Sequence, residues 1–142
     1  MNPTESFSIH DLTSFPLVRM KDGAAMPGYA AQWAKEMDAL LSLSRPFVML
    51  HGSSEGGEAH EDRKGRGLWL KRHKEELGRY CLAMIGIEAD PLKRQAMKAM
   101  SAMATKAFGT PTYVVESDDE AVELANRLLG AFDVQEVAGD AR

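Results

Sequence analysis

Short apolar runs that alternate with helical periodicity are the feature that most constrains what this chain of 142 residues can fold into. The runs occupy residues 47–50, 82–87 and 112–116. A largely continuous apolar run of this length is typical of a strand buried on both faces of a sheet. Helices between such strands act as crossover connections, which join parallel strands. We therefore expect an α/β fold with a mostly parallel sheet and helices packed on its faces.

The first part of the chain adds two strand-like segments before this alternating pattern. Residues 6–10 and 15–21 have strand character, and the polar residues 11–14 connect them, which favours a hairpin. Pro16 lacks a backbone N–H group, so we expect the second strand to begin near that residue. An antiparallel pair at this position would make the sheet mixed.

Helix boundary signals divide the rest of the chain. Pro27 suits the first turn of a helix, because its missing N–H would have no partner there. Asp90 is a good N-cap, Gly109 a good helix stop, and Ser117 a second good N-cap. The expected helices span residues 27–44, a stretch that starts between 62 and 68 and ends near 81, residues 91–108 and residues 118–129. The element order is then β-β-α-β-α-β-α-β-α.

Apolar spacing predicts which face of each helix packs on the sheet. For the helix over residues 91–108 the predicted inner face is Leu92, Ala96, Met100, Met103 and Ala107. The methionines Met97, Met100 and Met103 could instead line an adaptable docking surface, but core packing is the preferred interpretation. The side chains expected to be largely buried are Trp33, Phe47, Val48, Leu50, Trp69, Ile85, Val114 and Leu128.

Length and composition favour one soluble domain with its own hydrophobic core. Cys81 is the sole cysteine, which excludes an intramolecular disulfide and a zinc site built on paired cysteines. The net charge of −4 argues against a nucleic-acid partner. No apolar run approaches the ~20 residues of a membrane span, and the first ten residues lack a signal-peptide pattern. We therefore expect a cytoplasmic, bacterial protein.

The element order and lengths over residues 6–129 resemble those of the STAS domain and the wider SpoIIAA-like group of anti-sigma-factor antagonists. The strand, loop and helix of residues 46–80 contribute to this resemblance, as does the segment FGTPTYVVESDDEAVELANRLL at 108–129. That segment is similar to the final strand, acidic turn and short helix of the family. The resemblance implies a single STAS-like α/β domain over residues 1–130, followed by a flexible polar tail over residues 131–142.

The resemblance also implies a position for a regulatory phosphate. In family members that switch partners, a serine at the start of the helix after the central strand accepts the phosphate. The matching positions here are Asp62, Arg63 and Lys64, and none of them carries a hydroxyl group. Ser53 and Ser54 lie earlier, directly after the strand. This departure from the family pattern argues against phosphorylation as the switch.

The glycine-rich loop over residues 51–66 is the predicted binding site. Ligands of open α/β sheets bind outside the carboxyl ends of the strands, near a topological switch point. Glycines would let backbone N–H groups approach an anion, and the following helix start with its basic side chains would attract it. The candidate ligand-binding residues are His51, Ser53, Ser54, His60, Asp62, Arg63, Lys64, Arg66 and Trp69.

The function predicted from these patterns is a non-enzymatic binding or regulatory module that uses the 51–66 loop. The expected partner is a protein or a small anionic ligand, a homodimer is also considered, and neither a cofactor nor a metal is expected. The loop matches neither the GxSxG nucleophile motif nor a glycine-rich nucleotide motif. The alternative is a small cytoplasmic enzyme with His51, His60 and Asp62 as acid–base or metal-binding groups.

We predict that incubation with a serine kinase of the anti-sigma type leaves no stoichiometric phosphate on this chain. The carboxylates of Glu61 and Asp62 already stand where the positive end of the helix would attract a phosphate. Intact-mass analysis checks this expectation. Phosphate at Ser53 or Ser54, together with lost binding to a partner, would contradict it.

Overall fold

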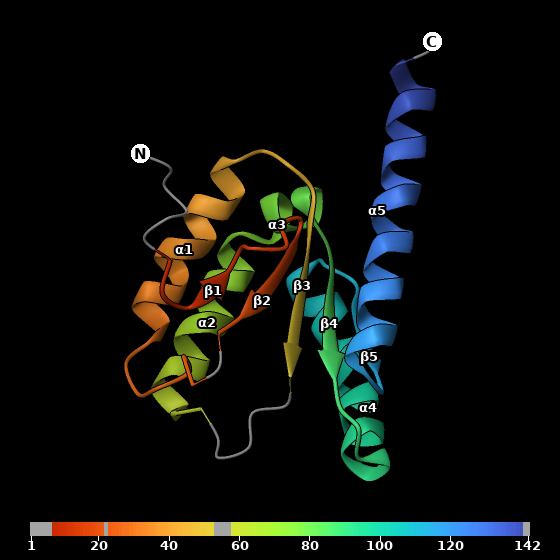
Figure 1. The fold of residues 1–142 in the computed structure, drawn as a ribbon. Helices are drawn as coiled ribbons and strands as arrows, with labels where there is room; N and C mark the ends of the chain where they lie inside the picture. The colour runs from red at the N-terminus through yellow and green to blue at the C-terminus, as the bar shows by residue number, and fades with distance from the viewer. Residues whose placement is uncertain (1–6, 22, 53–57, 141–142) are drawn as a thin grey trace.

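The computed structural model describes residues 7–21, 23–52 and 58–140, with side chains up to residue 132. Within these residues the strands form one sheet in the order β1-β2-β3-β4-β5 (Figure 1). The strands are His10–Asp11 (β1), Leu17–Met20 (β2), Phe47–Gly52 (β3), Cys81–Ile87 (β4) and Thr112–Val115 (β5). Strand β1 pairs antiparallel with β2, and β2 to β5 are parallel. The predicted α/β fold, N-terminal hairpin and mostly parallel mixed sheet are therefore confirmed.

The helices cover the two faces of the sheet unequally. They are Ala30–Ser42 (α1), His60–Arg72 (α2), Lys74–Tyr80 (α3), Pro91–Phe108 (α4) and Asp118–Asp140 (α5). The parallel strands follow one another in a single direction, so right-handed crossovers put α1 to α4 on the same face. Helix α5 follows the last strand and covers the opposite face (Figure 1).

Each face of the sheet has its own hydrophobic cluster. On the face of α1, α2 and α3, the fully buried Met37, Leu40 and Leu77 pack with Phe47 of β3. On the face of α5, Ala121 and its neighbours pack against the buried residues of β3 and β4. Of the predicted core residues, Trp33, Phe47, Val48, Leu50, Trp69 and Ile85 are buried, whereas Val114 and Leu128 are half-buried.

The helix boundary signals read from the sequence act as expected at α4 and α5. The Asp90 side chain accepts a hydrogen bond from the Leu92 N–H at 2.9 Å, and Gly109 ends α4 with a left-handed φ of 74°. The Ser117 hydroxyl accepts a hydrogen bond from the Glu120 N–H at 3.2 Å, at the start of α5. These caps satisfy backbone groups that a helix leaves without partners at its ends.

Two helices differ from their predicted extents. The segment predicted as the second helix begins at His60 and forms two helices. Helix α2 ends before His73, and α3 begins after it. The Trp69 carbonyl accepts both the His73 N–H at 3.0 Å and the His73 ring Nδ1–H at 2.9 Å, so a side chain competes for the helical acceptor. Helix α5 continues from Leu129 to Asp140, because residues 130–140 contain no proline to stop it.

The predicted inner face of α4 is wrong. Leu92, Met100 and Met103 are 79%, 69% and 74% exposed, and no residue of α4 is fully buried. The partly buried residues of α4 are Arg94, Met97, Ser101, Ala104, Thr105, Ala107 and Phe108. Helix α4 has apolar residues on two opposite faces, so periodicity alone could not decide between them. Since α4 is last in its row, no further helix of the described residues covers the outer face.

The strand order also corrects one assumption about the binding site. The parallel strands β2 to β5 never reverse direction of addition, so the described strands contain no topological switch point among them. The expectation that the loop after β3 lies beside such a point is therefore wrong. In doubly wound folds, a ligand crevice opens where two neighbouring crossover helices lie on opposite faces of the sheet. Here the described crossover helices all lie on one face, so no such crevice forms between them.

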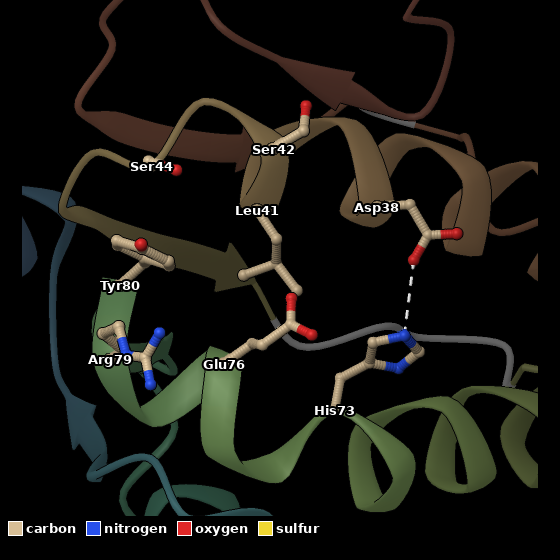
Figure 2. A pocket seen from close by; sticks show the side chains of 8 residues that line it. All are labelled: Asp38, Leu41, Ser42, Ser44, His73, Glu76, Arg79 and Tyr80. Atoms are coloured by element: carbon tan, nitrogen blue, oxygen red, sulfur yellow. Dashed lines mark ion pairs between the residues drawn. The ribbon is translucent and has the colours of Figure 1, made fainter.

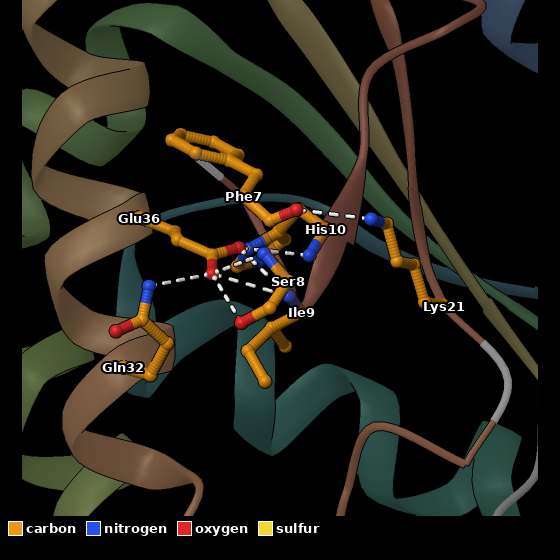
Figure 3. Close-up of polar contacts among 7 residues, drawn as sticks. All are labelled: Phe7, Ser8, Ile9, His10, Lys21, Gln32 and Glu36. Carbon is orange, nitrogen blue, oxygen red and sulfur yellow. Dashed lines mark hydrogen bonds and ion pairs between the residues drawn. The ribbon is translucent and has the colours of Figure 1, made fainter. Parts of the chain in front are cut away.

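A buried carboxylate on α1 fixes the segment that leads into β1 (Figure 3). Glu36 is 1% exposed and accepts hydrogen bonds from the backbone N–H groups of Ser8, Ile9 and His10 at 2.8–3.1 Å. The Gln32 amide donates a further bond at 2.9 Å. Burial opposes the charge, but these bonds outweigh it and lower the pKa of Glu36 to about 2.

The same carboxylate selects one form of a buried histidine. The His10 Nδ1 lies 2.9 Å from a Glu36 carboxylate oxygen, which can only accept, so Nδ1 carries the proton. Burial lowers the pKa of His10 although Glu36 acts to raise it. The imidazole is therefore neutral, and its buried Nε2 has no hydrogen-bond partner among the described residues.

We predict that the free energy of unfolding decreases steadily as the pH is lowered from 7 towards 3. Unfolded His10 gains a proton below about 6.5, and unfolded Glu36 below about 4.5, whereas the folded forms resist protonation. The unfolded state then binds more protons, which destabilises the fold as pH falls. Urea titrations over this pH range measure the effect.

Glu36→Gln should lower the free energy of unfolding at pH 7 by about 3 kcal/mol, because an amide N–H₂ would face backbone N–H donors. The variant should also lose part of the acid dependence below pH 4.5. The exposed Glu75 provides the control Glu75→Gln, which should be neutral. Equal urea midpoints for the two variants would contradict the role assigned to Glu36.

Candidate functional site

Among the residues that the structure describes, the predicted loop candidates are not gathered into one site. Ser53 and Ser54 lie outside the described residues. His60 is exposed at the first position of α2, and Arg63 and Lys64 are exposed on its first turns. The remaining candidates, which are Asp62, Arg66, Trp69 and His51, contact other parts of the fold.

Asp62 acts as a structural cap for another helix. It is 5% exposed, and its carboxylate accepts hydrogen bonds from the N–H groups of Gly28 at 2.8 Å and Ala30 at 3.0 Å. These groups belong to the start of α1, where Tyr29 provides no side-chain cap. The carboxylate that we expected to serve the start of α2 thus stabilises the start of α1. Only the folded chain brings together residues so far apart in sequence.

Arg66 has an internal anionic partner. Its guanidinium donates to both carboxylate oxygens of Glu58, at 2.5 and 2.6 Å, and lies 5.7 Å from the Trp33 ring centroid. The Tyr29 hydroxyl donates to the same carboxylate. Although burial opposes ionisation, Arg66 and Tyr29 lower the pKa of Glu58. The most buried cation of the predicted anion site is therefore neutralised within the fold.

His51 and Trp69 also have structural neighbours. A Cβ atom added at Gly86 would lie 3.2 Å from the His51 ring and 3.0 Å from the end of Met97, so these two side chains cover Gly86. Burial, and then the charge of Arg66, lower the pKa of His51. Trp69 is buried and donates its ring N–H to Asp38 at 3.0 Å. In the described part of the chain, no three His, Cys, Asp or Glu side chains are placed to hold a metal ion.

The outer face of α4 is the main surface feature that the sequence interpretation assigned to the core. We use this name for the exposed residues Leu92, Ala96, Ala99, Met100 and Met103. Six large hydrophobic side chains are exposed among the described residues, and Leu92, Met100 and Met103 are three of them. A fourth, Tyr113, lies on the edge strand β5, where its register with Ile85 places it on the α5 side of the sheet, away from α4. The signal for this surface was the repeated methionine of α4.

Positive charges border the outer face of α4. Residues 91–108 contain three lysines and one arginine and no acidic residue. Lys93, Lys98 and Lys106 are all exposed, and the helical spacing places Lys93 and Lys106 on the two sides of the apolar stripe. Within the described part of the chain, neither Lys98 nor Lys106 forms an ion pair. The face is therefore an apolar stripe with a cationic border.

Comparisons with known proteins identify no relative, because no family model, characterised protein or solved structure matches this chain. The resemblance to the SpoIIAA-like group therefore stays a proposal. None of the helices in the described residues combines the length and hydrophobicity that crossing a bilayer requires.

We predict that Asp62→Ala lowers the free energy of unfolding by about 1–2 kcal/mol, the usual cost of losing a helix N-cap. The neighbouring Glu61 is exposed, so Glu61→Ala provides a control for the loss of one carboxylate from α2. Urea titration measures both variants, and amide exchange at the start of α1 reports the site of the loss. Identical stability and exchange in the two variants would contradict the capping role.

Proposed function

We propose that this chain is a non-enzymatic protein-interaction module that binds its partner on the outer face of α4. The observation that carries this proposal is the concentration of exposed Leu92, Met100 and Met103 on one helix. Contiguous exposed apolar residues commonly mark protein interaction sites. Methionine side chains are unbranched and polarisable, so they adapt well to a partner surface.

The charges around the face indicate the chemistry of the partner. An apolar stripe on a helix is matched by the apolar stripe of a second helix. The exposed Lys93 and Lys106, one on each side of the stripe, would then lie opposite the flanks of that helix, where Asp or Glu gives favourable complementarity. The proposed partner is therefore an amphipathic helix with an apolar stripe and acidic flanks.

A second copy of this chain fits the face less well. Two-fold pairing of α4 with its copy would bring two sets of cations together, because residues 91–108 contain no acidic residue. Helix α5 is acidic at its start, but none of its described side chains is a large exposed hydrophobic residue. It therefore offers charge without the apolar stripe that the face requires.

A membrane surface also fits the face less well. Helices that lie in a bilayer interface typically use Trp, Phe and Leu on the apolar side, whereas this face contains two alanines among its five residues. The net charge of −4 for the whole chain would also oppose approach to anionic lipid.

The SpoIIAA-like resemblance supports the same class of function, because the family members described above act through protein partners. The internal contacts of Asp62 and Arg66 shift the proposed binding surface away from the 51–66 loop. No second function is proposed for that loop.

We predict that a fluorescent helical peptide of about 18 residues, or five turns, with leucines on one face and glutamates on its flanks, binds this protein. Fluorescence anisotropy measures the affinity. Met103→Ser should weaken binding about tenfold through lost apolar burial, and Lys106→Glu should also weaken it at low salt. A peptide with lysines in place of glutamates should bind weakly.

Matched exposed residues elsewhere provide the controls. Met26 is 67% exposed away from α4, and Lys35 is exposed on α1, so Met26→Ser and Lys35→Glu should leave peptide affinity unchanged. Peptide affinity that is unchanged by the α4 substitutions would contradict the proposal. A dimer in analytical ultracentrifugation that Met103→Ser dissociates would assign the face to a second copy, and cosedimentation with phosphatidylglycerol vesicles that depends on Met103 would assign it to membrane.

A further inference from the structure

A polar depression of about 520 Å³ lies between the end of α1 and helix α3, away from the outer face of α4 (Figure 2). Its volume is within the roughly 300–1,000 Å³ range of small-molecule sites. Figure 2 shows Asp38 and His73 at one end, Arg79 and Tyr80 at the other, and Glu76 between them. The two ends have different hydrogen-bonding character.

The His73 end of the depression is lined by carboxylates. The His73 Nδ1–H donates to the Trp69 carbonyl at 2.9 Å, and the His73 Nε2 lies 3.6 Å from a carboxylate oxygen of Asp38. Glu76 adds a second carboxylate to the lining. A ligand that donates several hydrogen bonds and carries positive charge satisfies this end.

The acceptors are held in place before any ligand arrives. The His73 ring stacks on Trp69 with centroids 4.1 Å apart and an interplanar angle of 18°. The Trp69 ring N–H donates to the Asp38 oxygen that faces His73, at 3.0 Å. Trp69 is itself buried against Trp33, with centroids 5.3 Å apart. Fixed acceptors lower the ordering cost of binding.

The opposite end offers hydrogen-bond donors and a positive charge. Arg79 is exposed there, and it forms no ion pair with Glu76 in the described part of the chain. Side-chain hydrogen bonds with Ser44 and, to a smaller extent, with Arg79 lower the pKa of the Tyr80 hydroxyl. A guanidinium with a neighbouring hydroxyl suits a carboxylate group.

We propose that this depression binds a small zwitterion, with its ammonium group at the carboxylates of Asp38 and Glu76 and its own carboxylate at Arg79. A metal ion is a poorer occupant, because the described side chains do not place three metal-binding groups together here. The ligand class is therefore an amino acid or an ω-amino acid. This inference goes beyond the protein-interaction function, because it concerns a separate surface and a different kind of ligand.

The test uses ¹⁵N-labelled full-length protein and two probes, 4-aminobutyrate and 6-aminohexanoate, with butylamine and butyrate as one-charge controls. Backbone amides around Asp38, His73 and Arg79 should shift and saturate with at least one ω-amino acid. Each one-charge control should bind at least about threefold more weakly, as expected for loss of one exposed ion pair.

Two variants separate the ends of the site. Asp38→Asn keeps an acceptor for the Trp69 N–H and should weaken binding of the ω-amino acids and butylamine about three- to fivefold, but not of butyrate. Arg79→Gln should weaken binding of the ω-amino acids and butyrate, but not of butylamine. Arg127→Gln, at an exposed position on α5, is the matched control and should change nothing.

The proposal is overturned if none of the probes shifts these amides, or if butylamine binds as well as both ω-amino acids. It is also overturned if Asp38→Asn and Arg79→Gln reduce binding of all probes alike. The peptide experiment on α4 is independent of these outcomes, since its variants lie on another helix. Failure here would therefore leave the protein-interaction proposal unchanged.

Discussion

The single direction in which the parallel strands are added is the constraint on which the rest of this structure depends. Right-handed crossovers between β2, β3, β4 and β5 put every connecting helix on one face, and they leave the opposite face to α5. The row of helices must then end at α4. Its inner side packs against β5, and its outer side has no neighbouring helix, so Met100 and Met103 are exposed.

Local signals in the sequence predicted the elements well and their surroundings less well. Asp90 and Gly109 act through neighbouring backbone groups, so the sequence alone was enough to place the ends of α4. The exposure of Met103 depends on the position of α4 in the row, which no local pattern contains. For the same reason, the cap that Asp62 gives to α1 and the pairing of Arg66 with Glu58 were not predicted.

The candidate surfaces differ in how far the sequence pointed to them. The methionine repeat of α4 allowed either core packing or a docking surface, and the preferred core packing was wrong for Met100 and Met103. The depression beside α3 had no sequence signal. Its lining combines Asp38 of α1 with His73 between α2 and α3, and their relation depends on the ring stack between His73 and Trp69. A charged residue on a helix is most often solvated, so the sequence does not indicate that Asp38 and His73 lie together. Only the folded structure shows it.

The open end of the helix row has a consequence for how this fold could grow. Strand β5 has a free hydrogen-bonding edge, since the described sheet ends there. A further βα unit added in the same direction would place its crossover helix directly against α4, on the side that now contacts solvent. A partner helix bound to α4 would therefore occupy the position of a missing internal repeat. Binding at this face would extend the layer of helices, with the additional helix supplied by another polypeptide.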